Sequence, residues 1–194
     1  MTPFSGRNRV TSPYGWRTIN GVKEFHYGED IVGDDNQTIR AIWDSIKCEV
    51  SIGYNGGRGN MVILYYNNNL RVINQRMNTV YVKNGQAVKQ GVHIGTMGNT
   101  GYSFGAHLHI EVQILQNGRW TPVEPSQYTE VPNTVGTHPG NNNYDKDPKP
   151  EPPPQPTPEP PLYMLTIGPA SEGDKNTLEA QATLLGIPVV VTKK

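Results

Sequence analysis

Cysteine is almost absent from this sequence. A single cysteine, Cys48, among 194 residues excludes any disulfide within the chain, so the fold does not depend on an oxidising compartment. A lone cysteine is more often a small buried apolar residue than a nucleophile. We therefore expect Cys48 to belong to the core.

An excess of either charge and a long apolar run are also missing. The 17 basic and 17 acidic residues give a formal net charge of zero, which argues against a general binder of nucleic acids or anionic membranes. No apolar stretch approaches the roughly 20 residues that span a bilayer. The beginning of the chain, MTPFSGRNRV, lacks the pattern of a secretory signal. We expect a protein that stays in the cell or is released without a signal peptide, with no nucleic-acid partner and no membrane insertion.

What the first 130 residues contain is a series of short apolar or alternating runs separated by turn signals. Asn-Gly pairs, as at residues 84–85 and 117–118, favour type I′ hairpin turns because both central residues need positive φ. No window shows a 3.6-residue period over more than ten residues. The pattern predicts a mainly β domain at residues 1–132, an antiparallel sheet or sandwich with functional groups at loops and strand ends. The runs lie at residue 10 and at residues 31–32, 39–43, 50–52, 61–66, 70–73, 80–82, 93–94, 108–115 and 120–123.

The composition changes after the first domain. Residues 133–161 are polar and then proline-rich, with nine prolines in the fifteen residues from 147 to 161, which favours an extended linker. Residues 162–194 follow a strand–helix–strand pattern. Such a small β-α-β module cannot bury much surface alone, so we predict that it associates with a second copy or leans on another surface.

Two histidines two residues apart, His107 and His109, lie in the glycine-rich stretch of residues 98–112. Because a strand has a side-chain period of two, both imidazoles face the same side. Alone, the pair is as consistent with solvated or core histidines as with half of a metal site. His26, with Asp30 four residues later, could complete a set of one carboxylate and two imidazoles. Three ligands with an open fourth position are typical of a catalytic zinc.

Two motifs carry a family resemblance: His-x-Gly-x-Asp at residues 26–30 and Gly-Ala-His-Leu-His-Ile-Glu-Val at residues 105–112. With them the chain resembles the lysostaphin-type (LytM-like) zinc metallopeptidases, which cut peptide bonds in bacterial peptidoglycan. The resemblance covers about residues 7–128. It includes the family's Ser-x-Tyr-Gly-x-Arg, Gly-Asn-x-Val, paired-turn and closing Val-Glu-Pro segments, at residues 12–17, 59–62, 82–101 and 123–125.

The resemblance implies a role for each residue of the site. His26, Asp30 and His109 would hold one zinc ion, Zn2+. His107 would be catalytic and not a ligand, because it can assist proton transfer or stabilise developing charge from the strand face that carries His109. The glycine-rich loop before it would form a wall of the substrate groove.

One position departs from the family pattern. The family has a further catalytic histidine in a Tyr-x-His segment, and counting without gaps places the tyrosine on Asn74 and the histidine on Arg76. Arginine cannot act as a general base at ordinary pH. Arg76 therefore either replaces the histidine as a hydrogen-bond donor to an oxyanion or marks a weakened enzyme. A local shift of register could instead bring Tyr66 or Tyr81 to this position.

The groove implied by the resemblance also has predicted substrate-binding residues. These are Asn74, at the position of the family's tyrosine, and Tyr102 and Ser103, in the glycine-rich loop.

The order of segments resembles that of a phage endolysin, with the catalytic domain first, then a linker and a small module. Such enzymes stay in the host cytoplasm until a membrane lesion releases them to the cell wall. The sequence thus predicts a zinc endopeptidase whose partner is bacterial peptidoglycan, with residues 162–194 as a cell-wall-targeting or self-associating module. The alternative is a catalytically weakened peptidase-fold protein, a phage structural or peptidoglycan-binding component.

Overall fold

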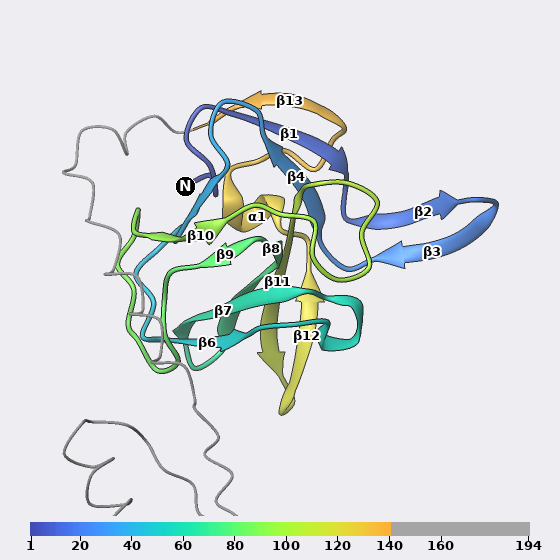
Figure 1. Cartoon of the computed structure of the whole chain (residues 1–194). Coiled ribbons are helices and arrows are strands. Elements are labelled where there is room, and N and C mark those ends of the chain that lie inside the picture. The colour runs from blue at the N-terminus through green and yellow to red at the C-terminus, as the bar shows by residue number, and fades with distance from the viewer. Residues whose placement is uncertain (141–194) are drawn as a thin grey trace, which may run out of the picture. The chain divides into compact units, whose positions relative to one another are not determined.

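The computed structural model describes residues 1–140 of the chain (Figure 1). Most of the predicted linker and the whole predicted module at residues 162–194 lie outside the described residues, so both stay predictions. No helix among the described residues is long and apolar enough to cross a membrane.

An eight-stranded antiparallel sheet forms the body of the described domain (Figure 1). The strand order is β13-β1-β4-β11-β8-β7-β6, and β12 pairs with β11 outside this path. The strands are β1 (Arg7–Ser12), β4 (Glu29–Gly33), β6 (Lys47–Ser51), β7 (Asn60–Asn67), β8 (Leu70–Met77), β11 (Leu108–Gln116), β12 (Arg119–Val123) and β13 (Gly136–Pro139). Neighbours in sequence, such as β7 and β8 or β11 and β12, form hairpins.

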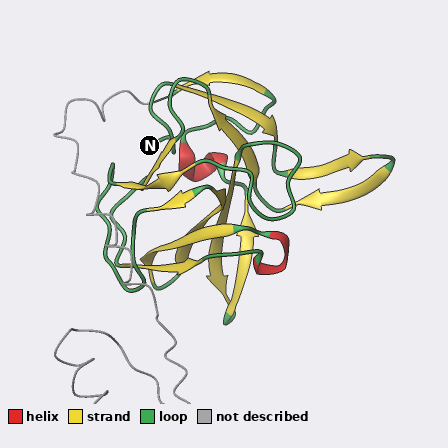
Figure 2. Cartoon of the chain, in the orientation of Figure 1, coloured by secondary structure: helices red, strands yellow, loops and turns green. Residues whose placement is uncertain are grey.

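Two smaller sheets and two short helical turns complete the domain (Figure 2). A three-stranded sheet has the order β5-β10-β9, and a two-stranded hairpin of β2 and β3 projects from the body (Figure 1). The elements are β2 (Gly15–Ile19), β3 (Val22–His26), β5 (Thr38–Arg40), β9 (Thr79–Val80), β10 (His93–Thr96), the 3-10 turn η1 (Asn55–Gly57) and α1 (Ser126–Thr129). The prediction of a mainly β, antiparallel domain is confirmed.

The core lies on one face of the large sheet. It contains side chains of β4 and β11, such as Ile31, Leu108 and Ile110, together with residues of the three-stranded sheet, such as Ile39 and Ile94. The predicted burial of the lone cysteine is confirmed as well, because its side chain is fully buried in the same cluster.

Strand periodicity then places the functional side chains. Asp30 and His109 alternate along β4 and β11 with the core residues Ile31, Leu108 and Ile110. Successive side chains of a strand point to opposite faces. Packing of the apolar side chains into the core therefore directs Asp30 and His109 to the other face of the sheet. The site is therefore built on the face that the core does not cover.

The hairpin of β2 and β3 is a pair of strands that the sequence did not predict. Its side chains are mostly exposed, so neither strand shows an alternation of buried and exposed residues that a pattern could reveal. Its turn is an Asn-Gly pair, Asn20 at φ 51° and Gly21 at φ 80°. These values are those of the type I′ turn, which matches the twist of two strands.

The prediction that the linker begins at residue 133 is wrong at its start. Strand β13 pairs with β1, with Arg7 opposite Pro139 and Val10 opposite Gly136. An edge strand is held by main-chain hydrogen bonds and needs no apolar alternation, which explains why its polar sequence resembles a linker.

The two predicted Asn-Gly turns have different outcomes. Asn117 and Gly118 both have positive φ, 51° and 75°, between β11 and β12, so that hairpin turn is confirmed. In the pair at residues 84–85, only Gly85 has positive φ. It lies in the loop after β9, where its N–H donates to the carbonyl of Cys48.

Candidate metal centre

Three strands bring His26, Asp30 and His109 together. β11 pairs with β4 so that His109 lies opposite Asp30, and His26 is the last residue of β3. His26 Nε2 lies 3.1 Å from His109 Nδ1 and 3.3 Å from Asp30 Oδ1, and His109 Nδ1 lies 2.9 Å from Asp30 Oδ1. Among residues 1–140 this is the one group of three or more potential metal-ligating side chains that converge in this way. We call these three residues the metal centre.

The metal centre has the geometry and the donor atoms that zinc requires. Ligand atoms about 2.1 Å from a tetrahedral zinc lie about 3.4 Å from one another, close to the three distances between these side chains. His26 also has its tautomer fixed, because its Nδ1 lies 2.9 Å from the carbonyl oxygen of Pro13 and donates to it. That hydrogen bond leaves the lone pair of Nε2 directed at the other two ligands.

The charges of the metal centre suit a divalent cation. Burial alone would raise the pKa of the Asp30 carboxyl, but its contacts with the imidazoles of His109 and His26 outweigh burial and hold that pKa well below its usual range. Burial lowers the pKa of His109, although the hydrogen bond to Asp30 opposes the shift. One carboxylate and neutral imidazoles are the forms in which these residues bind metals.

Arg17 positions the carboxylate, a role that the sequence reasoning missed. Its Nη1 donates to Asp30 Oδ2 at 3.3 Å and to Ser12 Oγ at 2.8 Å, and its Nη2 lies 2.6 Å from Glu24 Oε1. With Oδ2 occupied in this way, Oδ1 faces the histidines. The signal was present in the Ser-x-Tyr-Gly-x-Arg motif, whose arginine this is.

Gly28 is required by the packing of the metal centre. A Cβ atom at this position would lie 2.5 Å from the carbonyl oxygen of Ile110 and 2.7 Å from Nε2 of His109. Both distances are shorter than any ordinary contact, so a side chain here would displace the ligand or its strand. This explains the glycine of the His-x-Gly-x-Asp motif through its close approach to β11.

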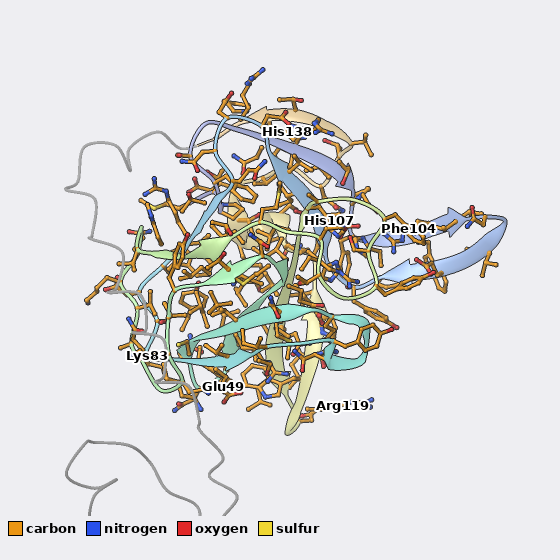
Figure 3. The ribbon with its side chains drawn as sticks, viewed as in Figure 1. Glu49, Lys83, Phe104, His107, Arg119 and His138 are labelled. Atoms are coloured by element: carbon orange, nitrogen blue, oxygen red, sulfur yellow. The ribbon has the colours of Figure 1, made fainter. Side chains whose placement is uncertain are left out.

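His107 joins the cluster beside the three ligands. Its Nε2 lies 3.4 Å from Asp30 Oδ1, while its Nδ1 lies 2.7 Å from the carbonyl oxygen of Gly105 and 3.4 Å from Ser103 Oγ. The contact with a carbonyl oxygen makes Nδ1 the protonated nitrogen and leaves Nε2 able to accept a proton. In Figure 3 the residue lies at the end of the loop that leads into β11.

Arg76 ties two loops together near the end of β8. Its φ is 70°, next to a bulge in the pairing of β7 with β8. Its Nη1 donates to the carbonyl oxygen of Gly57, and a Cβ atom on Gly101 would lie 2.8 Å from the same nitrogen. The guanidinium thus binds the loop at residues 53–59 and lies against Gly101 of the loop at residues 98–106, and we call this arrangement the loop clamp.

The environment of the Arg76 guanidinium is partly desolvated. Burial lowers its pKa, and the negative charge of Asp30 opposes that shift. Its Nε is buried and has no hydrogen-bond partner among the described residues. The Nε–H of Arg76 therefore has no acceptor among the described residues. Asp30 is close enough for its negative charge to stabilise the charged guanidinium. The catalytic role of Arg76 stays a prediction.

The two tyrosines considered for a shifted register lie elsewhere. Tyr66, in β7, packs against the ring of Trp43 at 5.2 Å and contributes to the core. Tyr81 follows β9 and donates its N–H to the carbonyl of Ile94.

Asn74 is not placed to bind substrate, so this prediction is wrong. It lies opposite Ile110 in β8, its side chain is 2% exposed, and its amide lies 3.5 Å from the carbonyl of Val62. Gln75 is the residue opposite His109, so it shares the face of the metal centre. The gap-free count along the sequence placed the family's tyrosine on Asn74. The pairing of β8 with β11 shows that the side chain on the face of the metal centre is instead that of Gln75.

The two loop residues predicted to bind substrate lie in the loop clamp. Tyr102 is 65% exposed and donates its backbone N–H to the carbonyl of Gly57. Ser103 contacts His107 and its hydroxyl donates to Gly105 O at 2.9 Å. Ser103 is therefore linked to the site through His107, and the contact of both residues with substrate stays a prediction.

Comparisons with known proteins match the part of the chain that contains the metal centre. The model of a family described as Peptidase family M23 matches residues 24–125. The chain is 35% identical over 113 residues to the peptidoglycan DD-endopeptidase ShyC of Vibrio cholerae, covering 57% of this chain and 25% of that protein. It is 33% identical over 119 residues to the DD-carboxypeptidase/endopeptidase Mpg of Neisseria meningitidis, covering 60% of this chain and 26% of that protein.

Among solved structures, the chain is similar to the catalytic domain of the prophage-encoded M23 protein EnpA from Enterococcus faecalis. The TM-score is 0.53 at 29% identity, over 62% of this chain and 91% of that one. The chain spans about a quarter of the length of the curated relatives that it matches.

Proposed function

The chain belongs to peptidase family M23, and on that premise we propose that it is a zinc-dependent endopeptidase that hydrolyses peptide bonds in bacterial peptidoglycan. The observation that carries the proposal is the convergence of His26, Asp30 and His109 within 3.3 Å of one another. The name of the relative ShyC, a peptidoglycan DD-endopeptidase, supports the substrate class.

His26, Asp30 and His109 would hold the zinc, which supplies a Lewis acid that polarises the scissile carbonyl and acidifies water. The chain provides the geometry around it. Arg17 and Pro13 fix the orientation of Asp30 and His26 through the hydrogen bonds described above. Partners of this kind keep ligands oriented and raise metal affinity.

His107 moves the proton in this proposal. Its Nε2 takes a proton from the attacking water while its Nδ1 stays hydrogen-bonded to the carbonyl of Gly105. The imidazolium that forms lies 3.4 Å from the Asp30 carboxylate, which stabilises its charge. The same nitrogen then delivers the proton to the leaving amine when the C–N bond breaks.

Arg76 supplies a hydrogen-bond donor in place of a second histidine. Its guanidinium lies at the end of β8, and its positive charge is partly desolvated and acted on by the charge of Asp30. A charged donor at such a position stabilises negative charge on the carbonyl oxygen in the transition state. The residue serves as an electrostatic group and not as a base.

The biological setting that we propose is that of a phage endolysin. A cytoplasmic enzyme of this kind would reach the wall after membrane lysis, with the proline-rich segment as a tether and residues 162–194 as a wall-targeting or self-associating module. Tethering would raise the local concentration of the enzyme on its polymer. The similarity to a prophage-encoded protein supports this setting.

The test is the clearing of purified cell walls. Zinc-loaded protein should clear a suspension of Gram-positive walls, a chelator should stop the clearing, and added zinc should restore it. Walls of both Gram types are assayed, with bound zinc measured on the same sample. If zinc is bound and no wall type is cleared, the enzymatic proposal fails.

A second candidate function is a weakened peptidase that serves as a phage structural or peptidoglycan-binding component. Arg76 at the predicted position of a catalytic histidine motivates it, since its guanidinium is engaged with Gly57. The substitution Arg76→His separates the two functions. A large gain in peptide hydrolysis supports the weakened enzyme, whereas a loss supports Arg76 as a working residue.

A further inference from the structure

Four aromatic side chains on and beside the hairpin of β2 and β3 form a contiguous cluster around Phe25. The Phe25 ring contacts Tyr14, Trp16 and Tyr27, with ring centroids 5.1, 5.4 and 5.0 Å away. The contacts with Tyr14 and Trp16 are edge-to-face, the arrangement that aromatic pairs prefer. We call these four residues the aromatic ladder.

The aromatic ladder remains open to solvent. Trp16 is 67% exposed and Tyr27 is 55% exposed, and Nζ of Lys23 lies 5.0 Å from the centre of the Trp16 ring. The hairpin projects from the body of the domain (Figure 1). An exposed apolar surface on a protruding element marks an interaction site more often than a structural one.

The aromatic ladder is also separate from the metal centre. Trp16 pairs with Phe25 and Arg17 with Glu24, so strand alternation puts the rings on one face and the Arg17–Glu24 ion pair on the other. His26 follows Phe25 and therefore shares the face of Arg17, which reaches Asp30. The rings lie beside the catalytic site without taking part in it.

We propose that the aromatic ladder binds the glycan strand of the polymer whose peptide is cut, an inference that rests on the proposed function. The C–H groups on the faces of pyranose rings pack against aromatic rings, while their hydroxyl and amide groups stay in water or form hydrogen bonds at the ring edges. Trp16 and Tyr27 offer such surfaces. Lys23 adds one positive charge, which suits a neutral or anionic polymer.

The size of the hairpin favours a single polymer strand over a protein partner. Two five-residue strands present a face about 17 Å long and about 10 Å wide, or about 170 Å². A stable protein interface buries about 800 Å² on each partner. The face is therefore too small for a stable dimer of this chain but matches a few sugar rings in a row.

The length of a stem peptide also matches the distance from the metal centre to the aromatic ladder. From His26 to Lys23 the strand extends about 10 Å away from the metal centre. About four extended peptide residues span at most about 14 Å. A stem peptide that leaves the metal centre along β3 would therefore bring its sugar attachment within reach of Phe25, Trp16 and Lys23. Binding of the glycan would orient the peptide and raise its local concentration.

The experiment uses the full zinc-loaded chain and two probes. The first is a preparation of glycan strands freed of stem peptides by an amidase, with affinity measured by calorimetry and by shifts of indole N–H resonances. The second is a soluble cross-linked peptide without sugar, with hydrolysis measured as kcat/KM. The variants are Trp16→Ala, Trp16→Phe and, as a matched control from the other face of the hairpin, Val22→Ala, whose native side chain is 64% exposed.

We expect Trp16→Ala to weaken glycan binding by about tenfold or more, as for other central aromatic contacts, while kcat/KM for the soluble peptide changes less than about twofold. Trp16→Phe should retain most of the binding and Val22→Ala all of it. Circular dichroism confirms that each variant folds. If Trp16→Ala fails to fold, titration of the wild-type indole resonances and the Trp16→Phe variant still test the assignment.

Several results would overturn the glycan assignment. They are a Trp16→Ala variant that binds glycan like the wild type, a Val22→Ala variant that loses as much, and a wild type that cleaves the peptide but binds no glycan. Glycan binding through Trp16 without any peptide cleavage would support the assignment and overturn the proposed enzymatic function.

Discussion

The metal centre and the loop clamp are built in different ways, although they lie side by side. His26, Asp30 and His109 stand on paired strands and are further fixed by Arg17 and Pro13. The loop clamp instead consists of two glycine-containing loops that meet at Gly57, whose carbonyl accepts hydrogen bonds from the Arg76 guanidinium and from the Tyr102 N–H. We conclude that strand pairing and side-chain hydrogen bonds fix the ligands in place. The loop clamp has fewer such contacts, so a single substitution there should change its structure more easily.

The largest effect is expected from removing a ligand. His109→Ala should abolish stoichiometric zinc binding and lower peptide hydrolysis by about a thousandfold or more, because two remaining ligands do not hold a catalytic zinc. Bound metal and kcat/KM are measured together. The control is His138→Ala, which removes a partly exposed histidine outside the metal centre.

Retention of zinc and activity by His109→Ala would contradict the ligand assignment. Equal losses in His138→Ala would show that the measurement reports on histidine content in general and not on the metal centre.

The next largest effect should come from the close packing behind the metal centre. Gly28→Ala places a Cβ atom 2.7 Å from His109 Nε2, so we expect zinc affinity to fall by about 10–100-fold, as for other losses of ligand orientation. Competition with a chelating dye measures the affinity. Gly105→Ala is a matched control, because a Cβ atom there meets nothing within 4 Å.

Equal zinc affinities for Gly28→Ala and Gly105→Ala would contradict the close-packing argument. That result would mean that the strand can shift without disturbing the ligand.

A change in the loop clamp should affect catalysis without affecting zinc binding at the metal centre. Arg76→Lys keeps the charge but cannot reproduce the planar guanidinium, so we expect about a 10–100-fold loss of kcat while zinc affinity stays unchanged. Hydrogen exchange of residues 53–59 and 98–106 should rise in the variant. Arg119→Lys, at the exposed start of β12, is the control.

Loss of zinc in Arg76→Lys would show that the two regions are one unit. Unchanged kcat together with faster exchange would show that the loop clamp has a purely structural role.

The smallest effect on the metal centre should come from Glu29, next to Asp30 in sequence but opposite Ile110 on the core side of β4. Burial, reinforced by the negative charge of Glu124, raises the pKa of its carboxyl to about 8. Between about pH 4.5 and about pH 8 the folded state then binds more protons than the unfolded state, so the free energy of unfolding falls as pH rises through this range and levels off above it. Glu29→Gln should remove this slope while zinc affinity changes little.

Denaturant unfolding of metal-free wild type and variant at several pH values measures the slope. Parallel stability curves for the two proteins between pH 6 and 9 would contradict the buried, protonated carboxyl.

The contrast between the regions also explains what the sequence could predict. His26, Asp30 and His109 were predictable because their spacing follows strand periodicity and a motif. The role of Gly28 was not, because it depends on contacts with β11, far away in sequence. Arg17 belongs to a motif, but its contact with Asp30 became visible only in the structure. The failure at Asn74 has the same cause, since the pairing of β8 with β11 decides which side chain faces the metal centre.

The fold was predictable to a similar extent. Buried strands such as β7, β8 and β11 carry an apolar pattern, whereas the exposed hairpin of β2 and β3 and the edge strand β13 have none. These elements are specified by turn geometry and main-chain pairing. That is why the aromatic ladder on the hairpin became visible only in the structure.

The most direct test of the central claim is mass spectrometry of a defined cross-linked muropeptide dimer incubated with zinc-loaded protein. The account predicts two fragments whose masses sum to that of the dimer plus one water, and no fragments with the His109→Ala variant. An intact dimer after incubation with protein that carries one zinc per chain would contradict it.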